Sequence, residues 1–136
     1  MITHAGGRQC NCGGEGCYEC YASAKALIEA VNKANSTNLD AFQIFEKENF
    51  DKPEVRSVID KWIDEMIIGL INIIYIFNPP LIVLGGGIMN EDYVIDLIDR
   101  KIYNLLMDNF KNVNIVRSKL NSDSALLGVA YEAAKL

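Results

Sequence analysis

All four cysteines of the chain, Cys10, Cys12, Cys17 and Cys20, lie close together near its start. Disulfides between such close neighbours would restrain little of a 136-residue chain, and a reducing cytosol would not maintain them. Glycines between Cys12 and Cys17 let the backbone bend sharply enough to aim the first three sulfurs at one point. The cluster therefore predicts a metal site, and soft thiolates favour zinc in a closed tetrahedral arrangement.

Three thiolates leave one corner of a zinc tetrahedron open, and the sequence offers two nearby candidates for it. His4 lies a few residues before the cluster, and Cys20 lies one helical turn beyond Cys17. His4 is also typical of a surface loop and Cys20 of a buried helix, since a free cysteine behaves as a small apolar side chain. Water or a partner chain could also fill this corner, so the fourth ligand stays open.

Charge and hydropathy exclude two classes of partner. The formal net charge is −5 and Lys and Arg form no stripe, so the chain has no surface built to neutralise nucleic-acid phosphates. No apolar run approaches the roughly 20 residues of a membrane span, and the first residues lack the pattern of a secretory signal. We therefore expect a cytoplasmic protein.

Half of the residues are apolar, enough to close one core, which predicts a single domain over residues 1–136.

Periodicity divides this domain into a metal-binding segment (1–20), a helical part (21–77) and a strand–helix–strand–helix part (78–136). The continuously apolar run 81–84 is typical of a strand buried on both faces, and the order of the last elements favours a parallel strand pair. The expected helices span residues 19 to about 35, 39–46, 53–77, 93–106 and 123–135, the last with Asp123 as its N-cap, and the expected strands span 81–84 and 113–116.

Gly85, Gly86 and Gly87 follow the first expected strand directly. Ligands bind at the carboxyl ends of parallel strands, and glycines there let the backbone pass close to a nucleotide. A glycine triplet alone is equally typical of a plain turn. Trp62 and the tyrosines, at helical spacing among aliphatic residues, favour core positions.

Three strings of residues resemble the ROK family of sugar kinases and sugar-responsive repressors. The first is CNCGGEGCYE over residues 10–19, followed by YAS over 21–23. The second is NPPLIVLGGGI over 78–88, which is similar to the family's strand and glycine turn near adenosine. The third is SDSALLGVA over 122–130, which is similar to its closing helix. The resemblance covers essentially the whole chain.

The resemblance implies an α/β fold, the carboxy-terminal lobe of an actin-like, hexokinase-type ATPase, rich in helices with a small parallel sheet and a zinc knuckle. It implies phosphorylation of a hexose or N-acetylhexosamine, such as glucose or N-acetylmannosamine, at the 6-hydroxyl with ATP and magnesium. It also implies a sugar-binding role for Glu19, a nucleotide-binding role for Gly85–Gly87, and a dimer. A solvent-facing glutamate in a first helical turn is the alternative for Glu19. The alternative function is the effector and dimerisation domain of a sugar-responsive repressor.

The family also has an amino-terminal lobe, and this chain matches none of it. That lobe carries a glycine-rich phosphate loop and an Asn-Asp pair whose Asp acts as general base on the sugar hydroxyl, so we predict no catalytic residue here. The family's usual fourth zinc ligand, a His in a Glu-x-Gly-His string, would fall immediately ahead of Met1. We therefore expect a product truncated at an internal Met, a split gene or an isolated domain, inactive as a kinase on its own.

Overall fold

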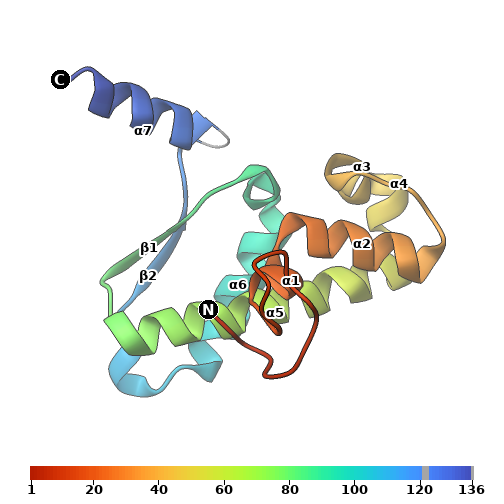
Figure 1. Cartoon of the computed structure of the whole chain (residues 1–136), viewed down its shortest axis with the longest axis horizontal. Helices are drawn as coiled ribbons and strands as arrows, with labels where there is room; N and C mark the ends of the chain where they lie inside the picture. Colours follow the sequence, from red (N-terminus) through yellow and green to blue (C-terminus); the bar gives the residue numbers. More distant parts are fainter. Residues whose placement is uncertain (121–122, 136) are drawn as a thin grey trace.

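Helix α5 (Pro53–Phe77) forms the centre of the structure, a computed structural model that describes residues 1–120 and 123–135 (Figure 1). Proline suits its first turn, where the backbone N–H would lack a helical partner. Asn78 ends it in the left-handed conformation, with φ +42°. Both ends agree with the prediction.

Shorter elements precede and follow α5. The described elements are α1 (Glu19–Ala22), α2 (Ala24–Asn35), α3 (Ala41–Phe45), α4 (Lys47–Phe50), β1 (Leu81–Leu84), the 3₁₀ turn η1 (Gly87–Asn90), α6 (Asp92–Leu105), the 3₁₀ turn η2 (Asp108–Phe110), β2 (Asn114–Arg117) and α7 (Ser124–Ala133). Five of them, α3, β1, α6, β2 and α7, lie within two residues of their predicted positions, whereas α4 and the two 3₁₀ turns were not predicted.

The core lies where α2 and α6 pack against α5. Leu27 and Val31 of α2 and Ile98 of α6 are almost fully buried, and all belong to one apolar cluster. A helix that is apolar around most of its circumference needs partners on several sides, and α5 has them in α1, α2, α4 and α6. The α5 residues buried in this way are Val55, Ile59, Trp62, Ile63, Met66, Ile67, Leu70 and Ile74.

The expected helix from residue 19 to about 35 is divided in two at Ser23. Ser23 adopts an extended conformation, with ψ 161°, and its hydroxyl accepts a hydrogen bond from the Ala26 N–H as the N-cap of α2. The indole N–H of Trp62 donates to the Ser23 carbonyl oxygen at 3.0 Å. The prediction of one continuous helix is therefore wrong, because local capping and a distant tryptophan stabilise the break.

Strands β1 and β2 pair in parallel, as predicted, with Ile82 opposite Ile115 and Val83 opposite Val116. The isoleucines pack against the core, whereas Val83 and Val116 are 55% and 42% exposed. The prediction that strand 81–84 is buried on both faces is therefore wrong for the described residues. One face of the strand pair packs against the core, and the other face is exposed.

The last helix, α7, stands apart from the helical body at the end of β2 (Figure 1). Leu126, Val129 and Tyr131 of α7 are between 65% and 72% exposed. Asp123 occupies the predicted N-cap position, but its side chain makes no capping hydrogen bond. Across the described residues, the helices are too short or too polar to cross a membrane.

Candidate metal and carbohydrate site

The cysteine segment is held by its own backbone before any side chain contributes. The Cys10 N–H donates to the Gly14 oxygen at 2.9 Å, and the Gly13 N–H donates to the Cys10 oxygen at 3.0 Å. This tight turn places Gly13 at φ +88°, a conformation that glycine adopts without steric cost. An antiparallel bridge between Gln9 and Glu15 closes the base of the turn.

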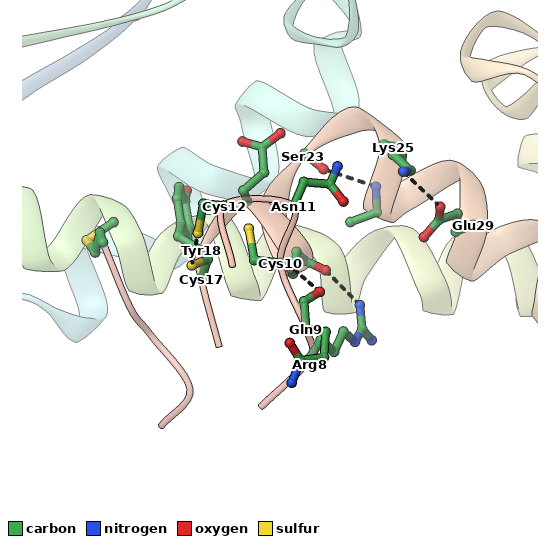
Figure 2. Close-up of a pocket in the computed structure, with 14 residues that line it drawn as sticks. Arg8, Gln9, Cys10, Asn11, Cys12, Cys17, Tyr18, Ser23, Lys25 and Glu29 are labelled. Atoms are coloured by element: carbon green, nitrogen blue, oxygen red, sulfur yellow. Dashed lines mark hydrogen bonds and ion pairs between the residues drawn. The ribbon is translucent and has the colours of Figure 1, made fainter. Parts of the chain in front are cut away.

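This folding gathers the three predicted thiol ligands, as Figure 2 shows for Cys10, Cys12 and Cys17. Their sulfur atoms all lie within 4.8 Å of one another, and those of Cys12 and Cys17 are 3.5 Å apart. Sulfurs bound to one tetrahedral zinc ion at about 2.3 Å would be about 3.8 Å apart. The donor set and its spacing therefore fit a zinc ion.

Hydrogen bonding within the cluster separates the pKa values of its thiols. The Cys12 backbone N–H and then the Cys12 thiol hydrogen-bond to Cys10 and lower the pKa of Cys10 to about 7. Hydrogen bonds with Cys12 and then Cys10 raise the pKa of Cys17 to about 11. Without metal, the Cys10 thiol therefore ionises near neutral pH, and its sulfur accepts hydrogen bonds from its neighbours.

His4, one candidate for the fourth ligand, lies outside this group of sulfurs. Its Nε2 atom is 3.5 Å from a carboxylate oxygen of Glu65, and its Nδ1 atom is 3.1 Å from the Thr3 hydroxyl. The ring stacks on Tyr21 with centroids 3.9 Å apart. Both ring nitrogens therefore have partners elsewhere, and His4 serves to anchor the segment.

Cys20, the other candidate, stands beside the cluster rather than inside it. Its N–H donates to the Cys17 oxygen at 2.9 Å in the turn that begins α1. Its thiol lies 3.5 Å from the Gln9 carbonyl oxygen, next to Cys10, with which it also interacts. Burial, followed by the contact with Cys10, raises the pKa of the Cys20 thiol.

Two tyrosines fasten the cysteine segment to the helices. The Tyr21 hydroxyl accepts a hydrogen bond from the Arg8 N–H at 2.8 Å, and the Arg8 guanidinium lies over the Tyr21 ring. Tyr18 donates through its hydroxyl to the Met66 oxygen of α5 at 3.0 Å. Its ring rests on Gly69, where a methyl group would overlap ring carbons. Burial, with a smaller contribution from Glu65, raises the pKa of Tyr18.

Glu19 is the first residue of α1 and its side chain is exposed. It lines an open cavity of about 600 Å³ together with all four cysteines. Figure 2 labels three of these cysteines, Cys10, Cys12 and Cys17. Its carboxylate forms no hydrogen bond or ion pair with any residue that the structure describes. Asn11, Ser23 and Lys25 add polar groups to the same wall, so this cavity suits a polar, hydroxyl-rich ligand.

The glycine triplet lies in a second cavity, of about 460 Å³, with an apolar lining. Gly86 has φ +110°, which favours glycine, and the space around Gly86 and Gly87 is open. Phe42 of α3 lines this cavity and is 79% exposed. The two cavities adjoin the α1–α2 break, since Ser23 lines the first and its neighbours Ala22 and Ala24 line the second.

Sequence reasoning missed two contributors to these sites. An exposed aromatic residue at Phe42 carries no periodicity signal, because the five-residue α3 is too short to reveal a face. The contact of Tyr18 with Gly69 joins residues far apart in sequence. The one sequence signal for this contact was a glycine inside a long apolar helix.

The chain is similar to known sugar kinases along most of its length. It is 27% identical to the glucokinase of Thermotoga maritima over 96% of this chain and 46% of that protein. Its structure matches a ROK family glucokinase from Streptomyces griseus, solved with glucose and AMPPNP, with a TM-score of 0.88 and 23% identity over 100% of this chain and 50% of the other. It thus spans about half the length of these proteins.

A third match is a regulator rather than a kinase. This ROK family transcriptional regulator, described as a homolog of the E. coli MLC protein, has a TM-score of 0.64 and 21% identity over 86% of this chain and 33% of the other. At such identities the two structural likenesses concern the fold. The ROK family model matches residues 1–135, so this chain belongs to the ROK family.

Proposed function

We propose that this chain is the carboxy-terminal half of an ATP-dependent kinase that phosphorylates a hexose or an N-acetylhexosamine at its 6-hydroxyl. In this proposal Glu19 binds the sugar, and zinc on Cys10, Cys12 and Cys17 holds the loop beside it. The observation that carries the proposal is the unpaired carboxylate of Glu19, two residues after three converging thiols, on the wall of an open cavity to which Asn11 and Lys25 add polar groups. The glucose and AMPPNP bound by the similar glucokinase support these substrate classes.

Glu19 has the chemistry that sugar recognition needs. An ionised carboxylate is an acceptor with two oxygens, so it accepts hydrogen bonds from two neighbouring hydroxyl groups. Such recognition is strong when the acceptor is held rigidly. Zinc would supply that rigidity as a structural ion, and Tyr18 and Tyr21 fix the same segment against α5 and the loop.

The second cavity is suited to the nucleotide. Gly85, Gly86 and Gly87 at the end of β1 let a ligand approach the backbone closely. The exposed Phe42 ring offers a face on which a purine base would stack. Because both cavities adjoin the α1–α2 break, sugar and nucleotide would bind on neighbouring surfaces of this half.

Phosphoryl transfer would also require the other half of the family fold, on the same or another polypeptide. The chain spans about half of the glucokinases that it matches, and positioning the phosphates and activating the sugar hydroxyl need further groups. A coupled assay of this chain alone with glucose, N-acetylglucosamine and N-acetylmannosamine should therefore give no turnover. Robust turnover would refute the need for a second half.

Sugar binding can be tested on the chain itself, loaded with zinc, by titrating each sugar and following amide resonances. Glu19→Gln should weaken binding at least about tenfold, because a hydrogen bond to a charged group contributes about 1.5–3 kcal/mol. Glu48→Gln removes the same charge from α4, outside both cavities, and should leave binding unchanged. Equal affinities for Glu19→Gln and the unaltered chain would remove Glu19 from the sugar site.

The second candidate function is the effector and dimerisation domain of a sugar-responsive repressor, favoured by the likeness to the ROK family regulator. A repressor domain of this kind would bind sugar without ATP, whereas the kinase proposal requires a nucleotide at the glycine turn. Titration with an ATP analogue distinguishes the two: changes at Gly85–Gly87 and Phe42 support the kinase. Sugar binding without any nucleotide effect supports the repressor.

A further inference from the structure

We infer that Glu91 accepts hydrogen bonds from the two ribose hydroxyl groups of the nucleotide, so that the chain selects ribonucleotides over 2′-deoxyribonucleotides. The inference rests on the nucleotide site of the proposed function, at the glycine turn after β1. Glu91 lines the same cavity as Gly85, Gly86 and Gly87. It would add to that site a group that recognises the ribose, beside the turn that the nucleotide approaches.

Glu91 differs in chemistry from the other described residues that line this cavity. The rest of the lining consists of alanines, glycines, aliphatic side chains, methionines and aromatic rings. Trp62 is the one other lining side chain that carries nitrogen or oxygen, and its N–H already donates to the Ser23 oxygen at 3.0 Å. A hydrogen bond from a described side chain of this lining to a ligand therefore falls to Glu91, and an ionised carboxylate can only accept.

The carboxylate of Glu91 is free to accept such bonds. Glu91 follows η1 directly, and its N–H donates to the Ile88 oxygen at 3.1 Å, which holds it beside the glycine turn. It occupies the N-cap position of α6, but its side chain makes no capping hydrogen bond. Arg117 donates instead to the Asp92 carboxylate at 2.5 Å. The Glu91 carboxylate thus forms no hydrogen bond or ion pair with any residue in the described part of the chain.

Partial burial suits this carboxylate to a ligand. The side chain of Glu91 is half-buried. Burial, followed by the charge of Asp92, raises the pKa of its carboxyl group, while Arg117 acts in the opposite direction. A carboxylate that has already lost part of its hydration gains more from a hydrogen-bond donor than a fully solvated one does.

The ribose matches this acceptor better than the base or the phosphates do. Its 2′- and 3′-hydroxyl groups are adjacent donors, and one carboxylate has two oxygens to accept them. Dinucleotide-binding folds use the same chemistry, since an acidic residue there binds the ribose 2′-hydroxyl. An adenine base places an acceptor nitrogen beside its amino group, which would oppose the second carboxylate oxygen. Phosphates carry charge of the same sign and would be repelled.

The test is a titration of the full chain with ADP and with 2′-deoxy-ADP, followed by the amide resonances of Gly85–Gly87. ADP should bind at least about tenfold more tightly, because the deoxynucleotide lacks one hydrogen bond to a charged group. In Glu91→Ala the affinity for ADP should fall at least about tenfold, and the two nucleotides should bind equally. Asp92→Asn removes the same charge from the neighbouring residue, which does not line the cavity, and should keep the preference for ADP.

The outcomes separate this inference from the proposed function. Equal affinities of the unaltered chain for the two nucleotides would overturn the ribose contact and leave the nucleotide site intact. A preference for ADP that persists in Glu91→Ala would overturn the role of Glu91. An unaltered chain that binds neither nucleotide would overturn both the site and the inference. If Glu91→Ala does not fold, Glu91→Gln replaces it and should reduce the preference for ADP, because the charge of the acceptor is lost.

Discussion

Gly16 is the residue on which the shape of the cysteine segment depends most directly. It has φ +70°, and its carbonyl oxygen accepts hydrogen bonds from the Thr3 and His4 N–H groups at 3.0 and 3.1 Å. A Cβ atom at this position would overlap the His4 carbonyl group. Gly13 has a similar φ of +88° but open space around it. A side chain at Gly13 would therefore meet only the cost of the left-handed conformation, whereas one at Gly16 would also meet the cost of steric overlap.

This difference predicts unequal effects on zinc affinity. Gly13→Ala should lower it about tenfold, because the left-handed conformation costs about 1–2 kcal/mol. Gly16→Ala should lower it at least a further tenfold, because overpacking adds about 1–3 kcal/mol that binding must overcome. Chelator competition measures both. Equal effects of the two substitutions would contradict the close packing of Gly16 on His4.

The thiol pKa values predict which cysteine reacts first when the metal is removed. The lowered pKa of Cys10, about 7, means that its thiolate is present above pH 7 and lost below it. Cys17, with a pKa of about 11, stays protonated around pH 7. Iodoacetamide should therefore modify Cys10 first, at a rate that reaches half its maximum near pH 7.

Peptide mapping after short exposures measures this selectivity, and Cys10→Ser is its control because it should remove the fast phase. Zinc should protect the cluster. Modification of all four cysteines with one common midpoint near pH 9 would contradict the hydrogen bonding described for Cys10 and Cys12.

At the scale of residues, the sequence predicted what local spacing determines. Three closely spaced thiols, with glycines between the second and the third, were expected to converge, and their sulfurs do lie together. The seating of Tyr18 on Gly69 could not be predicted, because it depends on how α1 docks on a helix about fifty residues away. The place of His4 follows in the same way from its contacts with Glu65 and Tyr21.

At the scale of elements, sequence patterns found the long helix and strands but missed the break at Ser23. Both bounds of α5 followed from Pro53 and Asn78, residues with strong positional preferences. The apolar residues of α1 and α2 keep a helical spacing across Ser23, so periodicity could not reveal the break. Its stabilisation by Trp62 is a tertiary contact.

The capping role of Ser23 predicts opposite effects for two serines. Ser23→Ala should destabilise the fold by about 1 kcal/mol, because the Ala26 N–H loses its acceptor. Ser57→Ala, at an exposed position inside α5, should be neutral or stabilise by up to about 0.5 kcal/mol, because alanine favours helices more than serine. Urea unfolding followed by Trp62, the chain's one tryptophan, measures both. A stabilising Ser23→Ala would contradict its capping role.

At the scale of the whole molecule, apolar surface remains open on the sheet and on α7. Val83 and Val116 form a register pair on the outer face of the strands, and α7 exposes Leu126, Val129 and Tyr131. The continuous apolar run 81–84 is a pattern of two-sided burial, and about half of the family fold lies outside this chain. We therefore propose that the other half covers this face in the complete protein.

Without that half, a second copy of the chain should take its place, because exposed apolar surface of this kind favours association. Sedimentation equilibrium should show a mass that rises with protein concentration. The double variant Val83→Thr/Val116→Thr should shift the chain toward the monomer with little change in stability, since threonine keeps the strand preference of valine. The matched pair Ile82→Thr/Ile115→Thr, on the face that packs against the core, should instead lower stability by about 2 kcal/mol or more, because it buries hydroxyl groups among apolar side chains. A strictly monomeric unaltered chain at every concentration would contradict self-association through this face.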